Sequence, residues 1–353
     1  MAQSLPHPRT AREFGVEARV RLACDVTAHV LRSILLVLPR PLRIQANAGE
    51  PAGVPPALRR LISRARSARL AQGGLHAQLL QAFHVARQRD WAVAAYSWLG
   101  DGGAPDAVYR LRADPVHLRA DRDALVLTQL NDVALTAEEA RQLIEALNGH
   151  FEADGLRFAA PVPCRWYVSA ARAPELETRP LESACGRNID RLLPSGPDAL
   201  VWHRYFNETQ MLLHTHPVNA AREAAGQLPV NSVWFWGGGV LPAPPRADLA
   251  AVWADDPVAR GLACAAGAQL HPQPRTCSEW LAHAGAGRHL VLIDAGLEAL
   301  ERDWFVPLLE ALRQHVLRLV CLLVGSDAEM LRYELTAADL WKFWRRAPAL
   351  AQP

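Results

Sequence analysis

Two continuous apolar runs near the end of the chain constrain its fold more than any other feature. They read HLVLID at residues 289–294 and LRLVCLLVG at residues 317–325, and a segment with a helical pattern, residues 301–315, joins them. Strands that are apolar throughout are typical of parallel sheets, because helices cover both faces of such sheets. A similar run, ILLVLP at residues 34–39, predicts a first strand of the same sheet. The pattern therefore predicts an α/β core.

Further helices and one more strand are predicted around these runs. Apolar spacing predicts helices at residues 56–70, 75–88 and 336–346, and a longer helix at residues 198–216. The buried stripe predicted for the longer helix consists of Leu200, Trp202, Phe206, Met211 and Leu213. The run SVWFW at residues 232–236 predicts a strand, which we assign to the parallel core.

Residues 106–182 have the pattern of a separate unit. Four strand-like segments surround one helical segment in the order strand, strand, helix, strand, strand. Thr136 precedes Glu139 by three residues at the start of the helical segment, which is the spacing of a capping box. This order predicts an α+β module with its helix on one face of an antiparallel sheet. We therefore predict a core made of residues 33–105 and 183–347, with the module of residues 106–182 inserted into it.

Composition and charge exclude several classes of partner. The formal net charge of +2 provides no basic face for nucleic acid, and no apolar run is long enough to predict a membrane helix. Six cysteines lie far apart without a C-x-x-C motif, which favours a reduced, cytoplasmic setting. Residues 1–32 show weak periodicity and are predicted to be an N-terminal extension, either disordered or added by an upstream start. Their charged residues make a secretory signal unexpected.

The segment LLHTHPVNAAREAAGQLPVNSVWFWGGG, residues 212–239, contains most of the candidate ligand-binding residues. His214 and His216 are two residues apart, so on one helix they would face different sides. No carboxylate or cysteine lies at ligand spacing nearby, and zinc sites use three or four ligands, so we expect no metal. His216 and Asn219 suit the capping of helix ends. Together with Arg222, they also offer a cation and several donors to a carboxylate or phosphate.

Two other groups of residues are candidates for ligand contact. Gly237, Gly238 and Gly239 follow the strand predicted at SVWFW, where a glycine loop lets backbone N–H groups approach an anion. The alternative is a tight turn beside bulky tryptophans, and the sequence matches neither a Walker loop nor a G-x-G-x-x-G motif. Asp114 and His117, in RADPVHLRADRD, could contact a polar ligand. The alternative for this pair is a solvated strand end and turn.

Taken in order, these segments resemble archaeal-type cofactor-independent phosphoglycerate mutases, which belong to the alkaline phosphatase superfamily. The pattern of residues 106–182 contributes to the resemblance, and so do His216, Pro217, Asn219, Arg222, Gly226, Asn231, Gly237 and Gly239. The stretches ADPVHLRADRD, LNGHF and PVNSVWFWGGG also resemble the RpfE-type proteins of Gram-negative bacteria, a group described as regulatory or phosphoglycerate mutase-like. The resemblance implies a parallel-sheet core of the mutase type with an inserted α+β module.

The mutase resemblance also implies a site with two metal ions, a serine nucleophile and Asp and His ligands. This sequence departs from that pattern at four places. The first strand, in LLVLPRPLRIQ, brings no Asp; VLIDAGLEALERDW offers Asp294 without a histidine; and Asp327 is followed by Ala328. The turn for which the family pattern has arginines reads TQLNDVAL. We therefore expect neither a metal nor another cofactor.

The combination predicts a mutase-like protein that lacks the dinuclear site and binds a small phosphorylated or carboxylate ligand in a non-catalytic or regulatory role. One alternative is a phosphomutase or phosphatase-type enzyme with altered chemistry, in which His117, His214 or His216 acts as acid or base. Another is a scaffold in which some of the 11 tryptophans dock a protein partner.

Overall fold

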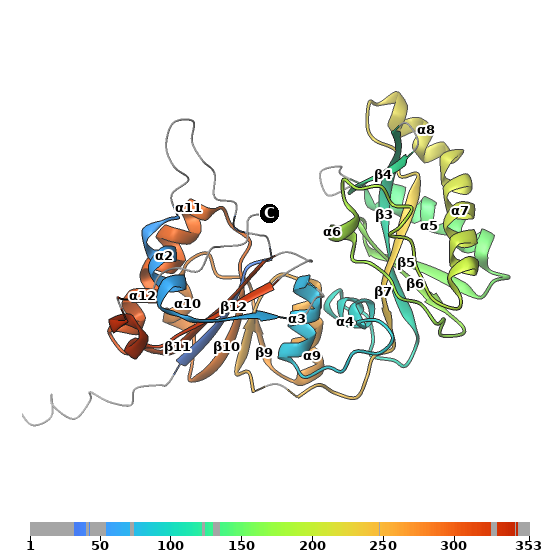
Figure 1. The fold of residues 1–353 in the computed structure, drawn as a ribbon. Helices are drawn as coiled ribbons and strands as arrows, with labels where there is room; N and C mark the ends of the chain where they lie inside the picture. Colours follow the sequence, from blue (N-terminus) through green and yellow to red (C-terminus); the bar gives the residue numbers. More distant parts are fainter. Residues whose placement is uncertain are drawn as a thin grey trace, which may run out of the picture.

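The computed structural model describes residues 32–39, 42, 54–70, 74–121, 124–129, 135–246, 248–325, 330–342 and 344. The predicted N-terminal extension, residues 1–32, lies outside these ranges except for its last residue, Arg32, which begins the first strand. The described chain forms two lobes, each built on a sheet of its own (Figure 1). Among the described residues, no helix has both the length and the apolar character needed to cross a membrane.

The larger sheet has seven strands in the order β2-β12-β11-β1-β10-β8-β9. Its parallel strands are β1 (Arg32–Val37), β8 (Ala251–Trp253), β9 (Gln269–His271), β10 (Gly287–Leu292) and β11 (Leu317–Gly325). At one edge, β12 (Met330–Leu335) and β2 (Arg66–Leu70) extend the sheet in antiparallel pairing. Strands β10 and β11 lie on either side of β1, which confirms the parallel pairing predicted from the two late apolar runs.

Both faces of the larger sheet are buried, because neighbouring residues of β1 pack into different apolar clusters. Ile34 and Leu36 belong to one cluster, and Leu35 and Val37 belong to the other. The helices that contribute to the first cluster are α2 (Pro56–Arg64), α10 (Cys277–His283), α11 (Leu297–Leu300), η2 (Glu301–Phe305) and α12 (Val306–Arg313). Those that contribute to the second include α3 (Gly74–Ala82), α4 (Val93–Gly100) and α9 (Pro257–Ala266). The fold is therefore mixed α/β with a parallel-strand sheet at its centre.

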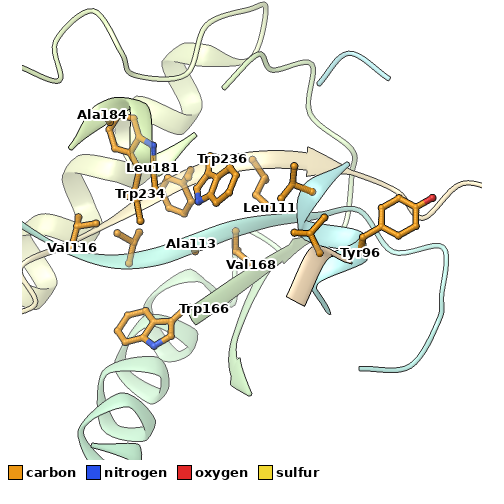
Figure 2. Packing of buried hydrophobic residues seen from close by; sticks show 14 of the residues in the cluster. Tyr96, Leu111, Ala113, Val116, Trp166, Val168, Leu181, Ala184, Trp234 and Trp236 are labelled. Carbon is orange, nitrogen blue, oxygen red and sulfur yellow. The ribbon is translucent and has the colours of Figure 1, made fainter. Parts of the chain in front are cut away.

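The smaller sheet is antiparallel throughout. Its strands are β3 (Arg110–Asp121), β4 (Ala124–Gln129), β5 (Leu156–Val162), β6 (Arg165–Ala170) and β7 (Ser232–Gly239). Helix α5 (Ala137–Phe151) packs on β5, and α7 (Ala199–His214), which precedes α8 (Pro217–Ala224), packs on β7. Figure 2 shows Trp234 and Trp236 close to the short helix α6 (Leu181–Ala184), with Trp166 on the opposite side of the strands. The capping box predicted at Thr136 and Glu139 is confirmed at the start of α5.

Three predicted helices differ from those in the structure. Residues 66–70, predicted to be helical, form strand β2, because β12 supplies an antiparallel partner that local spacing does not reveal. The helix predicted at residues 75–88 ends at Ala82, and α4 has no counterpart among the predictions. Within the described residues, the helix predicted at 336–346 is a short 3₁₀ helix, η3 (Ala337–Trp341).

The stripe predicted to be buried on the long helix is partly wrong. In α7, Leu200 and Met211 are 82% and 66% exposed, whereas Trp202, Phe206 and Leu213 are buried. The buried face consists of Trp202, Tyr205, Phe206, Thr209 and Leu213, each of which lies three or four residues from another member, as the helical period requires. The two exposed residues lie off that face, so their apolar character is not evidence of burial.

The assignment of SVWFW to the parallel core is also wrong. Strand β7 pairs antiparallel with β3 in the smaller sheet, with Trp236 opposite Arg112 and Trp234 opposite Asp114. Its unbroken apolar sequence fits burial on both faces, a property that does not identify the partner strand. The predicted module boundary at residue 182 separates β7 from the strands β3–β6 with which it forms one sheet. We propose that the inserted module extends to Gly239.

The two lobes meet where α4 crosses α9. Helix α4 also packs on β3 and β7 of the smaller sheet, so it contacts both lobes. At the crossing, a Cβ atom on Gly100 would lie 1.9 Å from the carbonyl oxygen of Pro257, and one on Gly261 would lie 1.8 Å from that of Tyr96. The helices are therefore packed backbone against backbone, at a distance that only glycine permits.

Candidate functional site

The polar residues of the turn between α7 and β7 bind the chain itself. His214, the last residue of α7, is exposed, and His216 is the N-cap of α8, where its Nδ1 accepts a hydrogen bond from the Val218 N–H at 3.2 Å. Asn219 is 1% exposed and bonds to Leu213 and to both backbone groups of Val230, at 2.7 to 2.8 Å. Burial lowers the pKa of His216. These contacts support the alternative that His216 caps a helix. Asn219 connects the end of α7 at Leu213 to Val230, just before β7.

Arg222 completes this internal network. Its side chain is 1% exposed; its Nε donates to the carbonyl oxygen of Leu228 at 2.9 Å, and its Nη1 donates to Glu139 at 2.9 Å. The ion pair therefore connects α8 to the capping box of α5. Asn231, another residue of the family resemblance, forms two hydrogen bonds with the backbone of Leu118 on β3. The residues of this segment that carry the family resemblance therefore hold α8 against α5 and the start of β7 against β3.

The three glycines lie inside β7 rather than in a loop beyond a strand. Each is buried, and each faces a close neighbour: a Cβ would lie 2.8 Å from Val93 Cβ at Gly237, 2.1 Å from Tyr109 Oη at Gly238, and 2.5 Å from Ala92 Cβ at Gly239. The N–H of Gly237 donates to the Thr178 hydroxyl at 2.8 Å. The close approach of the start of α4 to the strand accounts for Gly237 and Gly239, and the Tyr109 side chain occupies the space beside Gly238. Of the three, Gly237 alone lines a pocket described below.

Asp114 and His117 do not act together, because residues three apart on a strand point to opposite faces. The Nδ1 of His117 lies 3.0 Å from the carbonyl oxygen of Pro229, against the segment that leads into β7. Asp114 is 2% exposed and lies at the wall of a pocket between the lobes. The structure therefore retains Asp114 as a candidate site residue and places His117 in a backbone contact.

A cleft between the lobes consists of two adjoining pockets. His76 of α3 and Trp236 of β7 line both of them, with ring centroids 5.3 Å apart. The first pocket, which we call the acidic compartment, encloses about 200 Å³ and is also lined by Arg112, Asp114, Pro115, Val162, Cys164, Arg165, Leu181, Glu182, Asp256 and Pro257. The second, the basic compartment, encloses about 150 Å³ and is also lined by Ala77, Arg87, Asp90, Trp91, Val93, Thr178, Arg179, Pro180 and Gly237.

The two arginines of the acidic compartment are already neutralised. Arg112 donates to Asp114 at 2.6 and 3.1 Å, and Trp236 Nε1 donates to the other oxygen of the same carboxylate at 2.7 Å. Burial raises the pKa of Asp114, while Arg112 and Trp236 act in the opposite direction. Arg165 forms a bidentate pair with Asp101, with both bonds at 2.6 Å, and Tyr167 donates to that carboxylate at 2.5 Å. Glu182 and Asp256 are the remaining carboxylates of this compartment.

In the basic compartment, positively charged side chains outnumber carboxylates. Its carboxylate, Asp90, accepts hydrogen bonds from the Thr178 hydroxyl, from the Thr178 N–H at 3.1 Å and from the Trp91 N–H at 2.7 Å. Burial raises the pKa of Asp90, whereas these hydrogen bonds and, to a smaller extent, the positive charge of Arg87 lower it. Arg87 and Arg179 are exposed, and within the described ranges neither forms a salt bridge. The compartment therefore offers two guanidinium groups to a ligand.

Comparison with known proteins relates this chain to one group of enzymes. No family model matches it. Over 137 residues it is 29% identical to the 2,3-bisphosphoglycerate-independent phosphoglycerate mutase of Methanosarcina mazei, a match that covers 37% of this chain and 34% of that protein. Over 141 residues it is 29% identical to the probable enzyme of the same name from Geobacter sulfurreducens, covering 40% and 35%. The chain is homologous to cofactor-independent phosphoglycerate mutases. The matches span about a third of the length of these curated relatives.

Two solved structures also align with most of the chain. One is a cofactor-independent phosphoglycerate mutase from Thermoplasma acidophilum, with 15% identity, a TM-score of 0.43 and coverage of 91% of this chain and 93% of that chain. The other is the PH0037 protein from Pyrococcus horikoshii, with 13% identity, a TM-score of 0.48 and coverage of 86% and 87%.

The two-metal site that the mutase resemblance implies would involve residues at one edge of the larger sheet. Helices that follow parallel strands begin at the carboxyl edge of the sheet, where such a site would lie. At that edge, β1 is followed by Leu38 and Pro39, and Asp294 follows β10. Nowhere in the described ranges do three or more His, Cys, Asp or Glu side chains converge as metal ligands. Asp327, named in the sequence analysis, lies outside those ranges.

The N-terminus of α2 lies at the same edge and is occupied by the chain itself. The Glu301 carboxylate accepts hydrogen bonds from the Ala57 and Leu58 N–H groups at 2.6 and 3.0 Å. A helix N-terminus attracts anions through its exposed N–H groups and its dipole. An internal carboxylate therefore takes a position where an anionic ligand would otherwise find favourable contacts.

Sequence reasoning missed most of the residues that line the cleft. His76, Arg87, Arg165, Arg179 and Glu182 are spread over residues 76–182, and none has a neighbour that forms a recognisable motif with it. Trp236 was visible only as part of an apolar strand. The signal that could have found Arg112 and Asp114 is their spacing, since residues two apart on a strand share a face and an Arg and Asp so placed can pair.

Proposed function

We propose that this protein is a phosphoglycerate mutase-related binding protein that recognises a small anionic ligand in the basic compartment and does not catalyse the mutase reaction. One observation carries the proposal: Arg87 and Arg179 line the same pocket while neither has an ion-pair partner within the described ranges. Guanidinium groups bind phosphate and carboxylate through paired, charge-assisted hydrogen bonds.

The homology favours a phosphate-bearing ligand. The relatives are named for phosphoglycerate, which carries one phosphate and one carboxylate. Two cations in a pocket of about 150 Å³ suit a group of that size and charge. The hydrogen bonds among Asp90, Thr178, Trp91 and Gly237 hold one part of the wall in place, which favours a pocket formed before a ligand arrives.

The absence of catalysis and a regulatory role form the second part of the proposal. The described residues assemble no donor set for a metal, and the helix N-terminus of α2 is filled by Glu301. Binding of the ligand would then regulate the interaction of this protein with a protein partner. The description of RpfE-type proteins as regulatory suggests such a role. The setting proposed is a reducing one, which is supported by the free thiols of Cys164, Cys264, Cys277 and Cys321 in the described chain.

Isothermal titration with inorganic phosphate and with 3-phosphoglycerate tests the binding site. The Arg179→Gln variant should weaken both affinities by about tenfold, because one charge-assisted contact is lost. Arg157→Gln is the matched control, since Arg157 is an exposed arginine on β5 that lines neither compartment. Unchanged binding by Arg179→Gln, or equal losses in the two variants, would rule out the basic compartment.

A second measurement separates binding from catalysis. The purified protein is assayed for conversion of 3-phosphoglycerate to 2-phosphoglycerate with Mn²⁺ or Mg²⁺ present, and its metal content is determined after dialysis. We expect no turnover and no stoichiometric metal. Metal-dependent turnover, or about two metal ions per chain as a dinuclear site requires, would overturn the proposal that the protein is not a catalyst. The proposed binding site would still be tested by the titration alone.

A further inference from the structure

The two compartments of the cleft differ in their available charge. In the acidic compartment, the guanidinium groups of Arg112 and Arg165 are paired with Asp114 and Asp101. These pairs leave two further carboxylates, those of Glu182 and Asp256, in the same pocket. In the basic compartment, two guanidinium groups face one carboxylate that already accepts three hydrogen bonds. The cleft is therefore negative at one end and positive at the other.

Neither Glu182 nor Asp256 pairs with a cation of the described chain. Glu182 is exposed and forms no salt bridge there, and Asp256 accepts a hydrogen bond from the Ala259 N–H at 2.9 Å as the N-cap of α9. Burial, and to a smaller extent the negative charge of Glu182, raises the pKa of Asp114, which indicates that Glu182 acts on the interior of the compartment. A ligand that enters this end must therefore tolerate or neutralise negative charge.

The two compartments adjoin one another, because His76 and Trp236 belong to the walls of both. A divalent metal ion is a poor occupant of the acidic end. Calcium takes six to eight oxygen ligands and magnesium requires octahedral coordination, whereas Asp256 already uses one oxygen to cap a helix. An ammonium group, with three N–H donors and one positive charge, suits two carboxylates better.

We propose that the ligand of this cleft is a small zwitterion, with its phosphate or carboxylate bound by Arg87 and Arg179 and its protonated amine bound beside Glu182 and Asp256. This inference rests on the proposed function, because it assigns the anionic end of the ligand to the basic compartment. It adds that the other end of the ligand is a protonated amine, a group that the names of the mutase relatives do not indicate.

The test compares two phosphate esters of nearly equal size. O-phosphorylethanolamine ends in an ammonium group and 2-hydroxyethyl phosphate ends in a hydroxyl group, so they differ at the end assigned to the acidic compartment. Isothermal titration should show O-phosphorylethanolamine binding about tenfold more tightly, since hydrogen bonds to charged groups are the stronger ones. The Glu182→Gln variant should reduce that preference to less than about threefold, with the affinity for 2-hydroxyethyl phosphate unchanged.

Two further variants test whether the preference for the ammonium ester depends on the carboxylates of the acidic compartment. Asp256→Asn retains a capping side chain for α9 but removes the charge, and it should also reduce the preference. Glu177→Gln is the matched control, because Glu177 is an exposed glutamate of the same segment that lines neither compartment. Equal affinities of the wild type for the two esters, or equal losses in Glu182→Gln and Glu177→Gln, would overturn the zwitterion inference alone. Failure of both esters and of inorganic phosphate to bind would overturn the proposed function itself.

Discussion

The turn between α7 and β7 and the cleft between the lobes contain similar residue types but differ in what those residues bind. In the turn, Asn219 and Arg222 are each 1% exposed, and their hydrogen bonds go to the backbone or to Glu139. In the cleft, Arg87 and Arg179 are exposed and without salt bridges in the described chain. Polar composition therefore does not identify a ligand site. The better criterion is a polar group whose bonding capacity the fold leaves unused.

The largest effect is expected when the network of the turn is broken. Arg222→Ala should lower the free energy of unfolding by about 3–5 kcal/mol, because it removes the donor to the Leu228 carbonyl and to one oxygen of the Glu139 carboxylate. Phosphate affinity of the folded variant should be unchanged. Urea unfolding followed by titration calorimetry measures both quantities.

The matched control for this variant is Arg204→Ala. Arg204 pairs with Asp154 at 2.7 Å but is 55% exposed, so its loss should cost no more than about 1 kcal/mol. If Arg222→Ala is as stable as Arg204→Ala and loses phosphate binding, the turn is a ligand site and the distinction between the two regions is wrong.

A smaller effect is expected from the glycines of β7. Gly239→Ala should destabilise the protein by about 1–3 kcal/mol, because the added Cβ would lie 2.5 Å from Ala92 Cβ and 2.8 Å from Ala92 Cα. Ligand affinity should again be retained. Gly149→Ala, in α5, meets no atom within 4 Å and should instead be neutral or stabilising, as expected in a helix. A stable Gly239→Ala variant that no longer binds phosphate would restore the glycine-loop hypothesis.

The smallest effect concerns the pH dependence of the turn. Burial lowers the pKa of His216 in the folded state below its ordinary value of 6.5. The unfolded chain therefore takes up the proton first, and the contribution of His216 to stability is present above pH 6.5 and is lost as the pH falls below it. Protonation also removes the Nδ1 acceptor for the Val218 N–H.

The His216→Asn variant tests this linkage, because asparagine caps helices without titrating. Urea unfolding at several pH values between 7.5 and 5.5 should show a shallower loss of stability for the variant than for the wild type. The difference should be below about 1 kcal/mol, which is the usual worth of a helix cap. Parallel pH profiles for the two proteins would show that His216 does not titrate in this range.

The core could be predicted from the sequence because its signals are local. The apolar runs that form β10 and β11, and the capping box of Thr136 and Glu139, each depend on residues close together in the chain. Strand β2 was mistaken for helix because its partner, β12, lies more than 250 residues away in sequence. The pairing of β7 with β3 is non-local in the same sense.

The candidate site was harder to predict than the core for a related reason. Its walls come from α3, α4 and the segment between them, from β3, β5, β6 and β7, and from the segments around α6 and α9, so no single stretch contains a recognisable group. The residues with the strongest family resemblance, His216, Asn219 and Arg222, owe their positions to hydrogen bonds that hold the lobe together. Asp114 was found from sequence as a polar residue, but its partners Arg112 and Trp236 were assigned only once the strands were paired.

The glycine contact between α4 and α9 has a consequence for selectivity. Asp256 and Pro257, which form one wall of the acidic compartment, begin α9, and the Pro257 carbonyl lies against Gly100. The position of that wall is therefore set by the absence of a methyl group at Gly100 and at Gly261, although neither glycine lines the compartment. One dimension of the cleft, and with it the size of molecule that would fit, therefore depends on two glycines that do not line it.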